Sequence, residues 1–213
     1  MSDAQRTPDL AAEAPFTRAD VELLERRCLH QGFFRLEALQ LRHRLFEGGW
    51  SGAMTREVHR RHDAVGVLLY GVARDAVVLV EQFRAGALED PASPWKLEVV
   101  AGLVEEGESP AEVARREAVE EAGARVGELI ELYAYYPSPG ACDERVTLFC
   151  GLVDSEGLGG VHGLDEEHED IRVHVLPFAR AWELLQAGRL DNAMCLIALQ
   201  WLAVERASLR ATR

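Results

Sequence analysis

The sequence predicts an α+β protein in which a small N-terminal antiparallel sheet precedes a larger domain of buried strands and helices. Three observations lead to this fold class. Apolar and polar residues alternate along residues 32–37 and 39–42, residues 64–71 are almost all apolar, and residues 110–122 carry the signals of a helix. Alternation is typical of half-buried strands, and a short apolar run is typical of a strand buried on both faces.

The N-terminal sheet is expected to contain roughly three strands, a number typical of a small sheet. The alternating segments, with a slip at Ala38, precede a turn at residues 47–49 and a second strand-like stretch at 54–58, which predicts a hairpin. The segment that starts at Val21 adds a strand. A sheet this small cannot bury a core alone. We therefore expect residues 1–58 to dock elsewhere, on the rest of the chain or on another subunit, and residues 59–213 to form the larger domain.

The larger domain alternates strands with helices and irregular connections. Residues 85–94, 137–144 and 155–163 are expected to be loops because they are rich in proline, glycine and turn-forming residues. Of the two helices at the C-terminal end, the first is stopped by Gly188. The second is capped at its start by Asp191 or Asn192. Strands are expected at 64–71, 76–84, 95–100, 127–136, 145–153 and 171–175, and C-terminal helices at 179–186 and 191–209.

The helix expected at residues 110–122 has clear boundaries. Ser109 can cap it, Pro110 suits its first position, Glu112 completes a capping box and Gly123 ends it. Small residues form a stripe along one side, with Val119 beside it, that would allow close packing on a sheet. The stripe consists of Ala114, Ala118 and Ala122.

Three glutamates of this helix share one side. At 100° per residue, Glu117, Glu120 and Glu121 fall within about a third of the circumference. Like charges four residues apart, as at Glu117 and Glu121, destabilise a helix by roughly 0.2–0.5 kcal/mol. A divalent cation would offset that repulsion, and Mg²⁺ typically uses one or two carboxylates plus substrate phosphates. Arg116 could orient a carboxylate. The alternative is an ordinary solvated acidic face.

Composition narrows the classes of partner and compartment. The net charge of −13 disfavours nucleic acid and anionic membranes as partners. Four cysteines without metal-binding spacing indicate reduced thiols in a cytoplasmic protein. We expect no signal peptide, and the longest apolar run, residues 64–73, is too short to span a bilayer.

The segment from Gly102 to Ala124 resembles the Nudix box, G-x5-E-x7-R-E-U-x-E-E-x-G-U, where U is a bulky aliphatic residue. All charged and glycine positions match, and alanine occupies both U positions. The matching residues are Gly102, Glu108, Arg116, Glu117, Ala118, Glu120, Glu121, Gly123 and Ala124. The resemblance implies a hydrolase that cleaves a nucleoside diphosphate linked to another group, using Mg²⁺ or Mn²⁺. It also implies that Glu117, Glu121 and the main-chain carbonyl of Ala101 bind the metal.

The resemblance extends along nearly the whole chain to the bacterial ADP-ribose pyrophosphatase family. The stretches that carry it lie near Gly32 and at residues 42–46, 81–84, 138–140, 169–175 and 191–193. Pro139, about 15 residues past the box, matches a marker for ADP-ribose as substrate. The resemblance implies an α/β/α sandwich with a mixed sheet. It also implies a homodimer in which N-terminal sheets exchange between subunits.

The same resemblance assigns roles to individual residues. For the substrate ADP-ribose it implies contacts from Phe33, Phe34, Arg56, Glu57, Arg84, Ser138, Gly140 and Glu144. Glu169 would be a further metal ligand, and Glu167 the general base, with Glu166 as the alternative because Cys142 and His168 depart from the family pattern. Glu120 and Arg116 would act beside the metal or help to hold it.

Two other functions are compatible with this pattern. One is hydrolysis of another nucleoside diphosphate sugar, in which the box chemistry is kept and the pocket differs. The other is a sensor that binds ADP-ribose without cleaving it. A sensor would be expected to lose box glutamates, and this sequence keeps them all.

Overall fold

The computed structural model describes residues 16–164, 166 and 168–211. The chain divides into two compact units, which are described separately. The first runs to Arg61 and includes Gly140–Asp143, and the second comprises His62–Pro139 and the chain from Glu144 onward. The first unit thus extends beyond residue 58, where the sequence pattern placed its end, and takes in a short segment from the middle of the chain.

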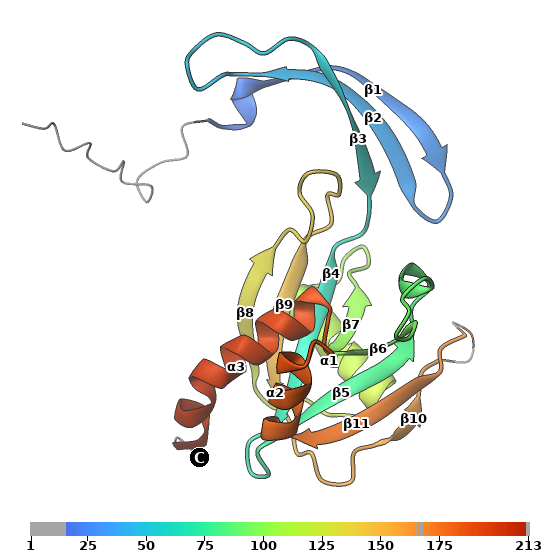
Figure 1. Ribbon diagram of the computed structural model, residues 1–213, viewed down its shortest axis with the longest axis vertical. Helices are drawn as coiled ribbons and strands as arrows, with labels where there is room; N and C mark the ends of the chain where they lie inside the picture. Colours follow the sequence, from blue (N-terminus) through green and yellow to red (C-terminus); the bar gives the residue numbers. More distant parts are fainter. Residues whose placement is uncertain (1–15, 165, 167, 212–213) are drawn as a thin grey trace, which may run out of the picture. The chain divides into compact units, whose positions relative to one another are not determined.

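The first unit is a three-stranded antiparallel sheet (Figure 1). Its strands are β1 (Val21–Gln31), β2 (Arg35–His43) and β3 (Met54–Arg60), and a 3₁₀ turn at Arg18–Asp20 precedes them. The predicted hairpin joins β2 to β3, and Gly48 and Gly49 in its connection have φ of 91° and 80°. Such angles favour glycine because it has no Cβ. Segment 140–143 joins the sheet through His59, whose N–H donates to the carbonyl of Ala141 at 2.8 Å.

A buried charge lies beside the slip in the alternation at Ala38. Strand β2 is continuous, and the register shifts lie in β1 instead. Glu37 is only 1% exposed and forms ion pairs with Arg26, Arg35 and Arg60 at 3.5, 2.6 and 2.8 Å. A buried charge of this kind needs partners. Glu37 is a polar member of the alternating stretch, yet its side chain is buried among these arginines beside the buried Ala38.

The second unit is built on a mixed sheet. Strands β4 and β9 pair in parallel, and the other pairings are antiparallel. The order is β10-β11-β5-β4-β9-β8, with β6 on β5 and β7 on β4. The strands are β4 (Ala64–Gly71), β5 (Ala76–Phe83), β6 (Trp95–Glu98), β7 (Val100–Leu103), β8 (Leu129–Tyr135), β9 (Val146–Leu152), β10 (Gly160–His162) and β11 (Ile171–Pro177).

Helices cover both faces of this sheet, which gives an α/β/α sandwich (Figure 1). Helix α1 (Pro110–Ala122) packs on one face with Val65, Val67 and other strand residues, while α2 (Phe178–Gln186) and α3 (Ala193–Ala211) pack on the other. All of β4 is buried, as its apolar run predicted. The predicted α+β fold class is confirmed. None of the described helices combines the length and apolar character needed to cross a membrane.

Three local expectations were wrong. Residues 95–100 form two strands rather than one, because the chain changes partner at Val99 from β5 to β4. The glycine-rich connection contains the short strand β10, which extends the sheet beside β11. Val119 is 50% exposed, and Val113 instead lies beside the buried alanine stripe.

Candidate functional site

Helix α1 and the strand before it form the frame of the candidate site. Strand β7 pairs with β4, and the chain then turns into α1. The predicted capping box is present: the Ser109 hydroxyl accepts from the Glu112 N–H, and the Glu112 carboxylate accepts from the Ser109 N–H at 2.9 Å. Gly123 ends the helix with φ of 60°. These signals fix where the helix begins and ends, and thereby where its glutamates lie.

Glu121 is the most enclosed acid of the helix, at 2% exposure. Its two carboxylate oxygens accept hydrogen bonds from different elements. The side-chain amide of Gln82, on β5, donates to Oε1 at 3.3 Å, and the main-chain N–H of Ala101, on β7, donates to Oε2 at 3.0 Å. The carboxylate is thus fixed between the helix and two strands.

Burial makes the charged forms of two glutamates costly. Burial raises the pKa of Glu121 to about 8, an increase that the Ala101 and Gln82 hydrogen bonds oppose and nearby Glu117 reinforces. Burial also raises the pKa of Glu117 to about 7, although Arg116 favours its charged form. Carboxyl groups with raised pKa values in a cavity are typical of functional sites, and a cation at this place would favour both charged forms.

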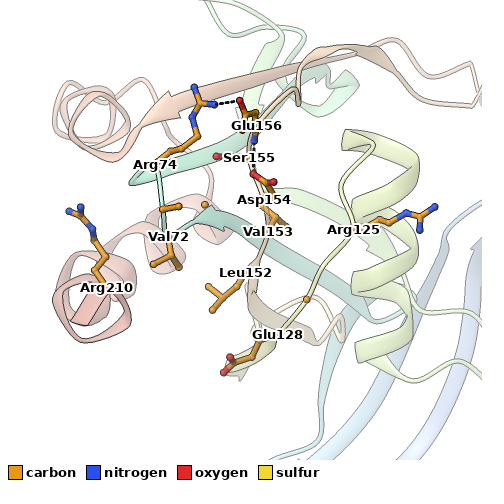
Figure 2. Close-up of a pocket in the computed structure, with 13 residues that line it drawn as sticks. Val72, Arg74, Arg125, Glu128, Leu152, Val153, Asp154, Ser155, Glu156 and Arg210 are labelled. Carbon is orange, nitrogen blue, oxygen red and sulfur yellow. Dashed lines mark hydrogen bonds and ion pairs between the residues drawn. The ribbon is translucent and has the colours of Figure 1, made fainter. Parts of the chain in front are cut away.

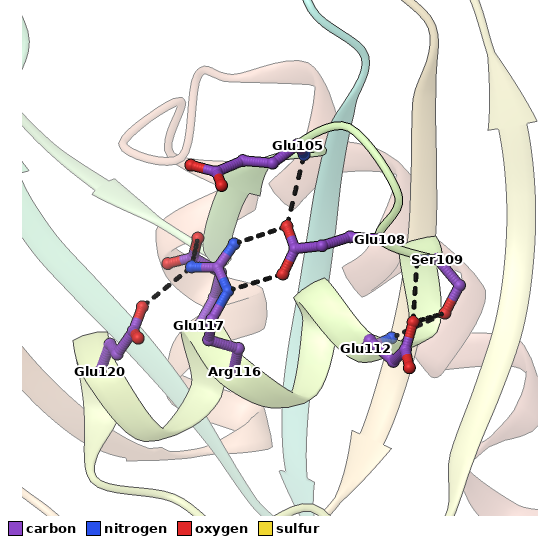
Figure 3. Close-up of polar contacts among 7 residues, drawn as sticks. All are labelled: Glu105, Glu108, Ser109, Glu112, Arg116, Glu117 and Glu120. Atoms are coloured by element: carbon purple, nitrogen blue, oxygen red, sulfur yellow. Dashed lines mark hydrogen bonds and ion pairs between the residues drawn. The ribbon is translucent and has the colours of Figure 1, made fainter.

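Arg116 connects the acids on the outer side of the site (Figure 3). Its Nε and Nη2 donate to the two carboxylate oxygens of Glu108 at 3.1 and 3.2 Å. Its Nη1 donates to Glu117 at 2.8 Å and to Glu120 at 3.0 Å. A paired contact with one carboxylate holds the guanidinium in a fixed orientation. Arg116 therefore orients Glu117 and partly neutralises the acidic group.

Gly102 leaves room for one of these carboxylates. A Cβ at this position would lie 1.9 Å from Oε1 and 2.2 Å from Cδ of Glu117. Such distances are far below van der Waals contact, so any larger residue would displace the carboxylate. The glycine of the motif is therefore explained by the close approach of Glu117 to the main chain of β7.

These groups surround a cavity of about 260 Å³ in the second unit. Arg84 reaches it from the end of β5, where its Nε donates to Glu98 at 2.7 Å. Glu169 reaches it from the segment before β11, where its carboxylate also accepts from the Leu164 N–H at 3.3 Å. The residues that line the cavity are Arg84, Ala101, Gly102, Leu103, Glu105, Arg116, Glu117, Glu120, Glu121, Leu164 and Glu169.

The donor set suits a hard divalent cation. Two enclosed carboxylates, Glu117 and Glu121, stand one helical turn apart beside the main chain of Ala101, and all three line the cavity. In the described part of the chain, no three acidic, histidine or cysteine side chains are arranged to hold a metal by themselves. Mg²⁺ commonly takes only one or two protein carboxylates and completes its shell with water and phosphate. The residues present fit such an ion.

Five other residues predicted for the site belong to the first unit. They are Phe33, Phe34, Arg56, Glu57 and Gly140. There the Phe34 ring contacts Phe33 and His59 at centroid distances of 4.8 and 4.7 Å, and Phe33 is 80% exposed.

Two predicted substrate residues belong to the second unit but are not among the residues that line the cavity. Ser138 is exposed and Glu144 is 9% exposed. Charge on Glu144 adds to the effect of burial in raising the pKa of Tyr135. Glu167, the predicted general base, lies outside the described residues, while its alternative Glu166 is exposed.

A larger cavity, of about 740 Å³, lies elsewhere in the second unit (Figure 2). It is formed by the β4–β5 turn, the segment after α1, the end of β9 and Arg210 of α3. Arg74 and Glu156 pair across its rim at 3.9 Å. None of the site residues predicted from the sequence lines it, and its lining contains arginines as well as acidic residues. The smaller cavity beside α1 is therefore the better candidate for catalysis.

Gln82 is a residue of the site that sequence reasoning did not single out. A signal was available, since Val78 and Val80 on the same strand face the buried side under α1. The period of two along a strand places Gln82 on that side as well. A polar residue at a position where the pattern requires an apolar one indicates a polar partner inside.

Comparison with known proteins identifies a family and several relatives of this chain. The NUDIX domain family model matches residues 60–196. The chain is 45% identical over 198 residues to the ADP-ribose pyrophosphatase of Haemophilus influenzae, covering 92% of this chain and 91% of that protein. It is 44% identical over 195 residues to the ADP-ribose pyrophosphatase of Escherichia coli K12, covering 92% and 93%.

More distant similarities point to the same fold. A GDP-mannose pyrophosphatase of Pectobacterium atrosepticum is 34% identical over 181 residues, covering 84% of this chain and 92% of that protein. The crystal structure of an ADP compounds hydrolase superposes with a TM-score of 0.65 at 20% identity, covering 87% of this chain and 96% of that one. At this identity the structural match concerns the fold alone.

Proposed function

Because this chain belongs to the NUDIX family, we propose that it is a hydrolase that cleaves the pyrophosphate bond of ADP-ribose. The reaction consumes one water and yields AMP and ribose 5-phosphate. The observation that carries the proposal is the group of carboxylates at one cavity, fixed by Arg116, Gln82 and the main chain of β7. The substrate is inferred from relatives at 44–45% identity that bear this activity in their names.

The metal is proposed to be Mg²⁺, with Mn²⁺ as a substitute. Glu117, Glu121 and the Ala101 carbonyl would hold it, with Glu169 as a further ligand. A bound divalent cation supplies Lewis-acid chemistry, since it neutralises charge on the phosphates and lowers the pKa of water. The protein's contribution is to orient the two carboxylates, Glu121 through the Ala101 N–H and Gln82, and Glu117 through Arg116.

Other side chains are proposed to contact the substrate, to activate water or to position the metal ligands. Arg84 lies at the cavity with its guanidinium held by Glu98, and a guanidinium suits contact with phosphate. Glu167, or its neighbour Glu166, would take a proton from the attacking water, a role typically worth 10²–10⁴-fold in rate. Arg116 and Glu120 position the metal-binding carboxylates. The substrate contacts inferred by resemblance for Phe33, Phe34, Arg56, Glu57, Ser138, Gly140 and Glu144 are part of the proposal.

We also propose that the protein acts as a cytoplasmic homodimer. Support for the dimer comes from apolar side chains exposed on the N-terminal sheet, where Leu23, Leu24 and Leu29 are 37%, 49% and 40% exposed. Apolar groups on a small sheet are expected to be covered by a partner. Support for the compartment comes from the four cysteines, all of which have free thiols.

The experiment is to compare hydrolysis of ADP-ribose by the wild type and by Glu117→Gln and Glu121→Gln. Both substitutions keep the shape and remove a metal-binding charge, so turnover should fall by orders of magnitude while circular dichroism stays unchanged. Glu131→Gln, at an exposed position of β8, is the matched control and should retain activity. Near-normal turnover in the first two variants would refute the catalytic assignment.

A further inference from the structure

Gln82 is a buried polar residue whose partner is a predicted metal ligand. It lies next to the last residue of β5 and is only 7% exposed. The residues two and four positions earlier on the strand, Val80 and Val78, belong to the core beneath α1. The side chain of Gln82 therefore enters the layer between the sheet and α1, where its Nε2 donates to Glu121 Oε1 at 3.3 Å.

The two hydrogen bonds to Glu121 hold different oxygens of its carboxylate. Ala101 N–H engages Oε2 at 3.0 Å, and Gln82 engages Oε1. Each carboxylate oxygen has about two lone-pair positions, so each keeps one for a cation. The Ala101 contact comes from the main chain and does not depend on the side chain present. The Gln82 contact depends entirely on the residue type at that position.

We propose that Gln82 is a positioning residue that fixes the orientation of Glu121 for a divalent cation. This inference rests on the proposed function, because it assumes that Glu121 binds metal. An amide suits the task because it donates a hydrogen bond without adding charge to a cavity that already holds several acids. Groups that orient metal ligands in this way typically change metal affinity or activity by 10–100-fold when removed.

A purely structural role would have a different signature. If Gln82 only filled space and satisfied a polar atom in the core, its replacement by an apolar residue of similar shape would change stability but leave metal affinity alone. Val80, on the same strand and 0% exposed, provides the contrast because it packs in the core beneath α1 and its side chain has no hydrogen-bond donor for Glu121.

The experiment measures Mn²⁺ binding to the full-length, substrate-free protein by electron paramagnetic resonance, together with thermal unfolding. The variants are Gln82→Met, which keeps the length of the side chain and removes the donor, and Gln82→Leu as a second apolar replacement. Val80→Ala is the stability control, and Glu121→Gln identifies the signal that belongs to this site. We expect the Mn²⁺ dissociation constant to rise 10–100-fold in both Gln82 variants. Val80→Ala should lower the melting temperature and leave Mn²⁺ binding unchanged.

The outcomes separate this inference from the proposed function. Wild-type Mn²⁺ affinity in a folded Gln82→Met or Gln82→Leu protein would overturn it, even if ADP-ribose is hydrolysed normally. Absence of an Mn²⁺ signal that depends on Glu121 would overturn it as well. If the wild type binds Mn²⁺ at Glu121, the Gln82 variants lose affinity, and ADP-ribose is not cleaved, the inference stands and the assigned substrate fails.

Discussion

Replacing Gly102 with alanine should cost catalysis much more than stability. The added Cβ would lie 1.9 Å from Oε1, 2.2 Å from Cδ and 2.5 Å from Cγ of Glu117. Ordinary contact begins near 3.4 Å, so the carboxylate must retreat by about 1–1.5 Å. A displacement of about 1 Å in a catalytic arrangement can cost on the order of 10²-fold in rate, or about 2.7 kcal/mol. We expect a loss of this size in kcat/KM for Gly102→Ala.

The fold should tolerate the same substitution. Gly102 has no positive φ, so alanine can adopt its backbone conformation. Reduced entropy of the unfolded chain favours alanine by roughly 0.4–1 kcal/mol, and disturbing the partly exposed Arg116–Glu117 ion pair costs about 0–1 kcal/mol. The assay measures AMP release and thermal unfolding in parallel.

The control for this substitution is Gly52→Ala, where an added Cβ meets nothing within 4 Å. It should retain both activity and stability. Full activity in Gly102→Ala would refute the role given to this glycine. Global unfolding of that variant would contradict the view that only the Glu117 side chain has to move.

Three further outcomes are expected. Arg116→Lys should lower kcat/KM by about 10–100-fold with the fold retained, because lysine cannot reproduce the paired contact that orients the acids, and steady-state kinetics would check this. Since burial raises the pKa of Glu117 to about 7 and that of Glu121 to about 8, the metal-free protein should lose stability as pH rises from about 5 to 8 and these carboxyls ionise. Thermal unfolding in EDTA should show this fall, reduced in Glu121→Gln, and a flat profile would contradict it. Glu37→Gln should lower the melting temperature, because it removes the charge that compensates three arginines in the N-terminal sheet, and a wild-type value would count against that role.

Much of the second unit could be predicted from local patterns. The apolar run of β4 identified a strand buried on both faces, and the capping box with Gly123 fixed α1 at both ends. The spacing of Glu117 and Glu121 then placed two carboxylates on one side of the helix. These features depend on residues close in sequence, so periodicity and capping rules suffice to find them.

Features that depend on contacts between distant segments were missed. The chain pairs with β5 before Val99 and with β4 after it, and no local sequence pattern indicates this change of partner. The hydrogen bond from Gln82 to Glu121 forms only because α1 lies against β5. Likewise, the burial of Glu37 was not predicted because its partners come from β1 and β3 as well as β2. Tertiary pairing decided each of these cases.

Product analysis with Mg²⁺ would show which of four compounds this protein cleaves: ADP-ribose, GDP-mannose, NADH or a nucleoside triphosphate. We expect AMP release from ADP-ribose to be fastest and EDTA to abolish it. Faster cleavage of GDP-mannose or another compound would keep the chemistry of the site and contradict the assigned substrate. Binding of ADP-ribose without cleavage of any substrate would contradict the claim that the protein is an enzyme and would identify it as a sensor.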